Sequence, residues 1–317
     1  MTIKNVLLLG GSGFVGTAVA NRLAKLDINV TVPTRRRERQ KALIALPNVT
    51  MVEANIHAPE QLAKLMEGQD AVINLVGVLH SRDLKMPYSR VFAEAHVELP
   101  KKVVAAAKAA GISRVLHMSA LKAAADGPSE YLRSKADGEA VMKTSGLDVT
   151  VFRPSVIFGV GDSFLSMFAK LLRLLPRFYV GFGQAKFQPV FVGDVAEVIV
   201  RALRDAHAVG QTYELVGPKV YTLRQIVEYV NEVTGARKTI KDLSEFWALI
   251  QAGVLSLAPQ PMLSPDNLRS MEVDSVAPEA QMPYGIAPTA MEAIAPTYLL
   301  GVAIKRHLDR YRLKAGR

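Results

Sequence analysis

A tyrosine and a lysine stand four residues apart in the stretch YLRSK, at Tyr131 and Lys135. Side chains at that spacing share one face of a helix. An ammonium group beside a phenol lowers the pKa of the phenol, which would prepare Tyr131 to exchange a proton with a carbonyl or hydroxyl during hydride transfer. Ser119 ends an expected strand twelve residues earlier and could hold the same oxygen. The alternative is an ordinary pair on a helix surface, and the pair taken alone fits that alternative better.

Three glycines follow the first apolar run in the sequence GGSGFVG, at Gly10, Gly13 and Gly16. The first permits a tight turn, the second lets a pyrophosphate approach the backbone, and the third lets the next helix pack closely on the strand. That helix begins at Phe14 and Val15, and its free N–H groups and positive dipole end point to the same place. The pattern predicts a dinucleotide site, and the alternative is a glycine-rich turn without a ligand.

The residues after the second expected strand indicate which nucleotide is bound. Arg35 stands nineteen residues past Gly16, where a site for NAD has an acid that binds the ribose hydroxyls. Arg36 follows, and no acid comes before Glu38. A guanidinium pairs with a 2′-phosphate through parallel hydrogen bonds, and a charge-assisted bond contributes about 1.5–3 kcal/mol. We therefore expect NADP(H) to be preferred about ten- to a hundredfold; a surface arginine run is the alternative.

Two more stretches are placed to contact the same nucleotide. Asn55 and Ile56 follow the third expected strand, and the Asn55 carboxamide can hydrogen-bond the edge of an adenine. Val76 and Gly77 end the stretch NLVG after the fourth strand. A small residue there lets a dinucleotide pass the edge of the sheet.

Short apolar runs alternate with helical patterns through the first half of the chain. The runs are apolar throughout, which predicts an α/β fold with a doubly wound parallel sheet covered on both faces. We expect residues 1–155 to form the nucleotide-binding domain and residues 156–317 a smaller α/β lobe for a substrate or partner, with 189–192 and 213–216 returning to the sheet. The expected strands are 5–9, 29–33, 49–53, 71–76, 114–118 and 149–153, and the expected helices are 14–26, 59–66, 91–110, 130–144, 195–204 and 223–234.

The composition limits the classes of protein. The 317 residues are half hydrophobic, enough for one large core or two coupled ones. With no cysteine, a disulfide framework and a cysteine zinc site are excluded, and we expect no metal and a reducing, cytoplasmic compartment. No signal peptide is visible, and no run reaches the ~20 apolar residues that cross a bilayer.

The net charge of +10 predicts anionic partners. Because no nucleic-acid motif accompanies it, we expect a phosphate-bearing ligand or an anionic membrane surface, and no nucleic acid. The apolar segment 246–258 either lies in a membrane interface, with Trp247 at headgroup level, or is a core helix of the second lobe. The last element, 298–313, is expected to be a helix that ends in basic residues.

The motifs GGSGFVG, NLVG, HMSAL, YLRSK, RPSVIFG and PVFVGDVA together resemble the extended short-chain dehydrogenase/reductase superfamily over residues 1–235. The resemblance implies that Lys135 also binds the nicotinamide ribose and that Pro154 and Ser155 lie near the nicotinamide. Members of the superfamily usually have an Asn before the fifth strand that holds a proton-relay water. This chain has His96 there and Pro100 just beyond, and a proline inside a helix breaks or kinks it.

That departure and the ending SPDNLRSMEVDSV…YGIAPT make the chain resemble an atypical group related to the alpha-subcomplex subunit nine of respiratory complex I. The resemblance implies NADPH bound structurally, near the quinone site of that complex. The chain is interpreted as a cofactor-holding accessory or assembly module linked to complex I or quinone metabolism, peripheral on the inner membrane. The alternative is an active NADPH-dependent reductase or a nucleotide-sugar epimerase or dehydratase, which the intact set of Ser119, Tyr131 and Lys135 favours.

Overall fold

The computed structural model describes residues 3–39, 41–81, 87–244, 247–248, 250, 253 and 264–300. The chain forms two compact units, each assembled from three separate stretches. The first unit consists of Met1–Pro154, Val192–Leu215 and Ala280–Ile286, and the second of Ser155–Phe191, Val216–Glu279 and Ala287–Arg317.

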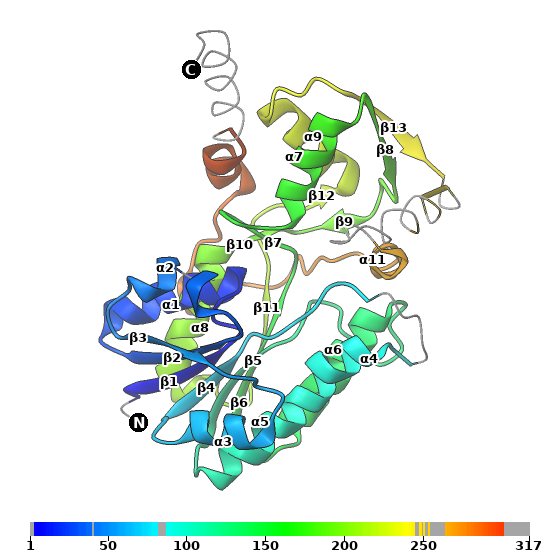
Figure 1. Ribbon diagram of the computed structural model, residues 1–317. Helices are drawn as coiled ribbons and strands as arrows, with labels where there is room; N and C mark the ends of the chain where they lie inside the picture. The colour runs from blue at the N-terminus through cyan, green and yellow to red at the C-terminus, as the bar shows by residue number, and fades with distance from the viewer. Residues whose placement is uncertain are drawn as a thin grey trace. The chain divides into compact units, whose positions relative to one another are not determined.

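A parallel sheet forms the centre of the first unit. Within the described residues it has seven strands in the order β11-β6-β5-β4-β1-β2-β3, and every neighbouring pair is parallel (Figure 1). The order reverses at β1, between β2 and β4, so the predicted doubly wound fold is confirmed. The strands are β1 (Asn5–Leu9), β2 (Asn29–Thr34), β3 (Val49–Glu53), β4 (Ala71–Asn74), β5 (Arg114–Met118), β6 (Asp148–Pro154) and β11 (Thr212–Leu215).

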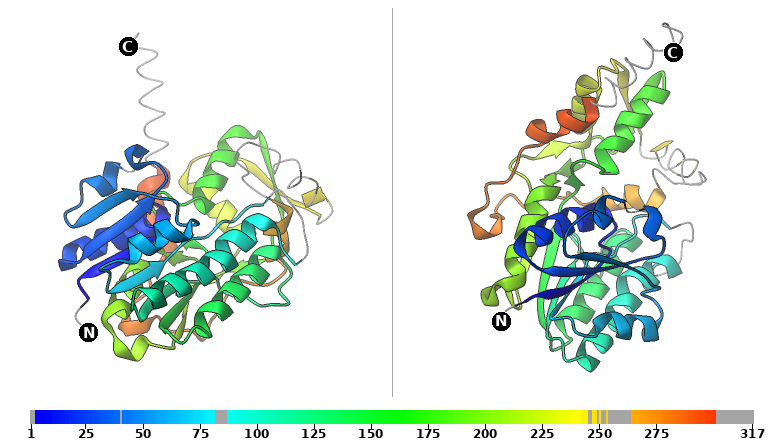
Figure 2. Two further views of the ribbon diagram at one scale, coloured as in Figure 1. Left: turned by 60° about the horizontal axis from the view of Figure 1, so that its bottom comes forward. Right: turned by 60° about the vertical axis from the view of Figure 1, so that its left-hand side comes forward.

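Helices cover both faces of this sheet. Right-handed crossovers that run in opposite directions from β1 place their helices on opposite faces. On one face, α3, α5 and α6 share an apolar core with the strands, and on the other α1 packs against α8 (Figure 2). The helices are α1 (Phe14–Leu23), α2 (Lys41–Ile44), α3 (Pro59–Met66), α4 (Arg90–Ala93), α5 (Leu99–Ala109), α6 (Glu130–Lys143) and α8 (Val192–Arg204).

The helix expected over 91–110 is divided into α4, a π-helical turn η3 (Glu94–Glu98) and α5. Pro100 has no N–H to donate to the carbonyl of His96 four residues earlier, which disfavours a regular α-helix at this point. The freed carbonyl faces α6, where a Cβ built on Gly138 would lie 1.8 Å from the His96 oxygen. Glycine at 138 therefore lets α6 approach the wide turn.

The second unit has its own apolar core, to which the helical stretches 164–174, 223–233 and 291–300 contribute. The segment expected at 189–192 does not return to the large sheet, because its strand pairs with β7 inside this unit; 212–215 does return, as β11. The pairs are β7 (Ile157–Phe158) with β10 (Val190–Phe191), β8 (Arg177–Gly181) with β13 (Thr239–Leu243), and β9 (Lys186–Phe187) with β12 (Tyr221–Thr222). The helices are α7 (Phe164–Leu174), α9 (Leu223–Val233) and α11 (Pro265–Ser270).

The two remaining expectations fall largely outside the described residues. In the segment 246–258, the Trp247 side chain is 58% exposed and Ala248 is buried against Leu268. Residues 291–300 are helical, and most of the helix expected at 298–313 lies beyond them. None of the described helices has the length and apolar character to cross a membrane.

Candidate nucleotide-binding site

The glycine-rich turn joins β1 to α1. Gly10 has a φ of 76°, which glycine adopts without steric cost. A Cβ on Gly16 would lie 2.3 Å from the Gly10 oxygen, so only glycine lets the first turn of α1 pack here. At Gly13, the one described atom within 4 Å of such a Cβ is the Gly10 oxygen, at 3.2 Å. Gly13 is exposed, so the space in front of it is accessible to a ligand, and Phe14 and Val15 after it are half-buried.

The ends of β2 and β3 supply the next residues. Arg35 and Arg36 follow β2 and are exposed, and neither forms an ion pair with a described residue. The turn after them is fixed because the Arg37 N–H donates to Glu53 Oε1 at 3.0 Å. Ala54 N–H donates to the Thr34 carbonyl at 3.1 Å, which holds the two strand ends together.

Asn55 and Ile56 follow directly after that contact. The Asn55 N–H donates to Gln61 Oε1 at 2.7 Å, and the Asn55 Oδ1 accepts from the His57 N–H at 3.1 Å. The exposed Asn55 thus uses its oxygen for its own turn. The amide end of the side chain is the part that fits an adenine edge.

Gly77, in the loop after β4, lies next to residues of the π-helical turn η3 and of α6. A Cβ on Gly77 would lie 3.2 Å from Lys135 Nζ and 3.7 Å from His96 Nε2. The Val76 N–H donates to Asn74 Oδ1 at 3.2 Å, which ends β4 before the predicted residue 76. A Cβ on Gly10 would lie 3.1 Å from the Val76 nitrogen, so this group adjoins the glycine-rich turn.

His96 is buried and engaged at both ring nitrogens. Its Nε2 accepts from the Val78 N–H at 3.0 Å, and its Nδ1 lies 2.8 Å from the Ser134 Oγ, which donates to the Tyr131 carbonyl at 2.9 Å. An accepting Nε2 places the proton on Nδ1. Burial, and next the charge of Lys135, hold the pKa of His96 well below its ordinary value. His96 is therefore a neutral brace between the loop after β4 and α6.

Lys135 and Tyr131 lie beside this brace, but the expected effect of one on the other is wrong. Lys135 Nζ is buried and donates to the Met118 carbonyl at 3.0 Å, and burial lowers its pKa to about 8. Burial raises the pKa of Tyr131 to about 12 instead of the lysine lowering it. The desolvation of the phenolate outweighs the lysine, whose own charge is disfavoured by the same burial. The Tyr131 ring packs edge-on against the His96 ring, 5.6 Å between centroids.

Ser119 follows β5 and is 2% exposed. Its hydroxyl makes no hydrogen bond of good geometry with the described residues, although it helps to lower the pKa of Glu139. Pro154 ends β6 in the first unit. Ser155 belongs to the second unit, where its Oγ donates to the Ser275 carbonyl at 2.8 Å.

Sequence reasoning missed two polar pairs that hold this region, one part-buried and one buried. Arg153 Nε and Nη2 donate to the two oxygens of Glu139, each at 2.8 Å, and join α6 to β6. Asn74 Nδ2 lies 3.3 Å from His117 Nδ1, and burial lowers the pKa of His117 to about 3. The available signal was a charged or polar residue at a position where helix and strand patterns predict burial.

Sequence reasoning also missed Gly11 of the glycine-rich turn. A Cβ there would lie 2.8 Å from Val32 Cγ1 on β2. Two adjacent glycines are needed in the turn, one for its backbone angle and one for its contact with the neighbouring strand. The first glycine of the pair was predicted from the motif; the second needed the strand order.

These residues fit a dinucleotide. They lie at the carboxyl ends of adjacent strands, next to the point where the strand order reverses, which is where such sheets bind ligands. The cradle in front of Gly13 would be filled by any side chain. A bound nicotinamide cofactor would supply hydride chemistry at this edge, and the Lys135 ammonium would be the group to hold its ribose hydroxyls.

Comparison with known proteins agrees with this geometry. The pattern of the NAD dependent epimerase/dehydratase family matches residues 6–216. The chain belongs to this family. Its fold is shared with the NADPH-dependent quinone oxidoreductase QOR2 of Escherichia coli, solved with NADPH, at a TM-score of 0.74 and 19% identity over 93% of this chain and 99% of that one.

Two proteins similar to this chain are named as subunits of NADH dehydrogenase or NADH-ubiquinone oxidoreductase. The mouse protein named NADH dehydrogenase [ubiquinone] 1 alpha subcomplex subunit 9, mitochondrial, is 30% identical over 297 residues, covering 90% of this chain and 77% of its own. The 40 kDa subunit of NADH-ubiquinone oxidoreductase from Neurospora crassa is 28% identical over 95% of this chain and 80% of its own. The expected resemblance to the alpha-subcomplex subunit nine is confirmed.

Proposed function

We propose that this family member binds NADP(H) at the carboxyl edge of its sheet and keeps it as a structural cofactor. In this proposal the chain is an accessory or assembly module linked to respiratory complex I or quinone metabolism, attached peripherally at the inner membrane. The relatives from mouse and Neurospora support the link, because both are named as subunits of that complex and match nearly the whole chain.

The observation that carries the proposal is the state of His96. A proton relay needs a group that can accept a proton and pass it on. Both nitrogens of His96 are already bonded, to Val78 and Ser134, and its lowered pKa opposes protonation. Tyr131 is also a poor acid, because burial raises its pKa to about 12. The site is thus better suited to holding a nucleotide than to supplying protons.

The preference for NADP(H) over NAD(H) rests on Arg35 and Arg36. Both are exposed after β2, at the position where an acid would select NAD. The Glu53 carboxylate accepts from the Arg37 N–H and so serves the turn itself. We infer that the two guanidinium groups face a 2′-phosphate, with Asn55 and Ile56 beside the adenine.

A second function is supported by the same residues. Ser119, Tyr131 and Lys135 form the set that an active reductase or a nucleotide-sugar epimerase or dehydratase needs. QOR2, a structural relative, is named as an NADPH-dependent quinone oxidoreductase. The similarity to QOR2 is one of fold, and a shared fold is weak support for a shared activity. The bonded state of His96 is the stronger argument, and it speaks against catalysis.

Two measurements on the purified protein distinguish these functions. The first is the nucleotide released on denaturation, which we expect to be NADP(H) in near-stoichiometric amount. The second is steady NADPH oxidation with a water-soluble quinone or a small carbonyl compound, which we expect to be absent. Sustained turnover that requires Tyr131 would overturn the structural role and establish the enzyme.

The link to complex I has a separate test. Tagged protein added to detergent-solubilised respiratory membranes should recover subunits of complex I, and a nucleotide-free Gly13→Val variant serves as the comparison. Recovery of other membrane complexes in equal amount would contradict the proposed partner.

A further inference from the structure

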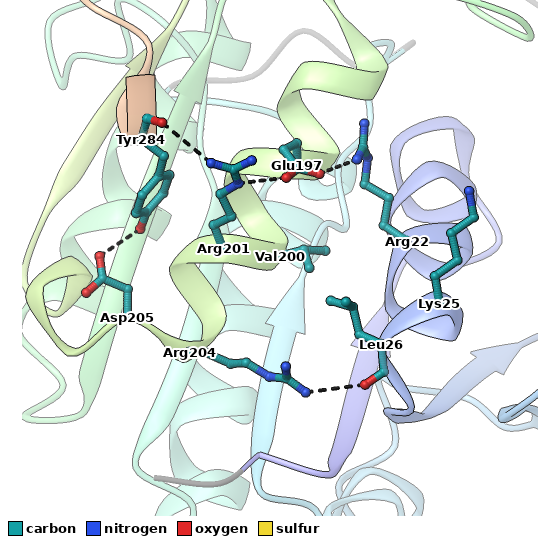
Figure 3. A pocket seen from close by; sticks show the side chains of 9 residues that line it. All are labelled: Arg22, Lys25, Leu26, Glu197, Val200, Arg201, Arg204, Asp205 and Tyr284. Carbon is teal, nitrogen blue, oxygen red and sulfur yellow. Dashed lines mark hydrogen bonds and ion pairs between the residues drawn. The ribbon is translucent and has the colours of Figure 1, made fainter. Parts of the chain in front are cut away.

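A groove lies at the opposite end of α1 from the glycine-rich turn. Arg22 is eight residues past Phe14, or ~12 Å further along the helix at its usual rise. The helical turn η1 (Ala24–Leu26), the last turns of α8 and Tyr284 complete a groove of about 530 Å³ (Figure 3). It belongs wholly to the first unit and shares no residue with the nucleotide site.

The lining carries an excess of positive charge. Its cations are Arg22, Lys25, Arg201 and Arg204, against the acids Glu197 and Asp205. A single carboxylate, Glu197, bridges two of the arginines: Oε2 pairs with Arg22 Nη1, and Oε1 accepts from Arg201 Nε at 2.6 Å. Lys25 and Arg204 have no acidic partner among the residues that the structure describes.

The arginines are held in place but keep donors for a ligand. Arg201 Nη1 lies 3.5 Å from the Tyr284 carbonyl, and Arg204 Nη2 lies 3.4 Å from the Leu26 carbonyl. A guanidinium has more N–H groups than these bonds use, so the remaining edges can receive carboxylates. Side chains fixed in advance lose less entropy when a partner binds.

An apolar surface lies between these charges. Leu26 is 41% exposed, whereas Val200 beneath it is buried. Figure 3 shows Leu26 pointing toward Val200, with Lys25 and Arg204 on either side. The groove thus offers a hydrophobic contact flanked by cations, which suits a ligand that alternates acidic and apolar groups.

Tyr284 closes the groove in a strained conformation. Its φ is 62°, in the left-handed region that costs a residue with a Cβ about 1–2 kcal/mol. Its hydroxyl donates to Asp205 Oδ2 at 3.0 Å, and its ring lies 6.4 Å from that of Tyr213. Such strain is commonly kept at binding sites, where the geometry is needed. The neighbouring sequence YGIAPT is also part of the resemblance described above.

We infer that this groove docks an acidic segment of a partner protein, with an apolar side chain on Leu26 and carboxylates on Lys25, Arg201 and Arg204. Charge complementarity identifies the occupant. A second copy of this chain is disfavoured because each copy carries a net charge of +10. An anionic bilayer would attract the cations but leave the apolar contact over Val200 unused, so a bilayer is the alternative that the vesicle measurement below tests.

The test uses a fluorescent peptide of repeating Glu, Asp and Leu, with binding followed by anisotropy at low salt. The double variant Lys25→Gln/Arg204→Gln should weaken binding about tenfold, as loss of two charge contacts implies. The variant Lys64→Gln/Lys108→Gln removes the same charge from exposed sites on α3 and α5 and should change binding about twofold or less. Thermal unfolding checks that both variants are folded.

The apolar part of the groove is tested by Leu26→Ser. It should weaken the Leu-containing peptide and leave unchanged a peptide in which Ser replaces Leu. Equal losses in the groove and control variants would reduce the effect to net charge and overturn the inference. The inference would also be overturned if the Lys25→Gln/Arg204→Gln variant kept its affinity for the peptide but no longer bound vesicles of phosphatidylcholine and phosphatidylglycerol. That result would assign the groove to a membrane.

Discussion

At His96, one buried imidazole makes two hydrogen bonds that link different elements. The Val78 N–H in the loop after β4 and the Ser134 hydroxyl on α6 are both satisfied by one ring. This arrangement keeps Gly77 close to Lys135. One ring therefore fixes the loop after β4 against α6.

Arg35 is predicted to select the nucleotide. Arg35→Asp should lower NADPH affinity at least about tenfold, because a carboxylate repels a 2′-phosphate and one charge-assisted bond is lost. NADH affinity should be unchanged or higher. Fluorescence titration of both nucleotides measures the ratio, and equal affinity of the unaltered protein for the two would contradict the prediction.

Gly13 is predicted to contact the pyrophosphate. Gly13→Val should abolish NADPH binding, because the side chain fills the space in front of the backbone, while its Cβ meets only the Gly10 oxygen at 3.2 Å within the described part of the chain. Circular dichroism should report an intact fold. NADPH binding at full strength by this variant would place the nucleotide elsewhere.

Lys135 and Tyr131 are predicted to separate binding from chemistry. Lys135→Ala should weaken NADPH binding, because it removes a donor to the ribose hydroxyls. Tyr131→Phe should leave binding largely intact, because phenylalanine keeps the edge-on ring contact with His96 and removes only the hydroxyl. Titration calorimetry gives both affinities. If Tyr131→Phe instead removes a measurable NADPH-dependent turnover, the protein is an enzyme.

At the scale of elements, the wide turn η3 and α6 depend on one contact. Gly138 of α6 faces the His96 carbonyl, and Pro100 lies 3.6 Å from a Cβ built on that glycine. Lys135 and Tyr131 lie on the same helix, within two turns of it. The contact between η3 and α6 thus holds in place the helix that carries both candidate residues.

Gly138→Ala is predicted to destabilise the fold although alanine is the better helix former. A Cβ placed 1.8 Å from the His96 oxygen must push the two elements apart, and such overpacking costs about 1–3 kcal/mol. Urea unfolding measures the loss. The control Ala140→Gly lies on the exposed face of α6. It measures the difference in helix propensity between alanine and glycine alone, ~1 kcal/mol. A gain in stability for Gly138→Ala would exclude the close contact.

The elements that follow from local pattern could be predicted, and those that depend on distant contacts could not. Strands β1, β3 and β5 and helix α3 have the predicted bounds, because short runs rich in apolar residues and a proline at the first helical position are local signals. Pro100 predicted a break in the helix expected over 91–110, but the form of the break, a π-helical turn packed against Gly138 of α6, depends on a residue far along the chain. Likewise, the motif predicted Lys135, but the bonds of His96 and the pairing of Glu139 with Arg153 join residues far apart in sequence.

At the scale of the whole molecule, two buried histidines link stability to pH. His96 and His117 are both neutral, because burial first and the charge of Lys135 second lower their pKa values. In the unfolded chain a histidine titrates near 6.5. As pH falls below that value, the unfolded state takes up protons that the folded state excludes, so stability is lost with acidification.

The free energy of unfolding should therefore decrease between pH 7 and pH 5. For His117, whose folded pKa is about 3, the loss amounts to ~2 kcal/mol at pH 5. Urea unfolding at several pH values gives the slope. His117→Asn should flatten it, whereas His207→Gln, at an exposed position, should leave it unchanged. A slope that His117→Asn does not alter would mean that other groups cause the acid sensitivity.

The three separate stretches of the first unit also set the order in which the molecule can be completed during synthesis. Strand β6 leaves the ribosome with β1 to β5, but its outer neighbour β11 follows only after the first stretch of the second unit has been made. During that interval β6 is an open edge of largely buried residues, a template for pairing with other nascent chains. Translation of residues 155–211 is therefore the period when this chain most needs a chaperone.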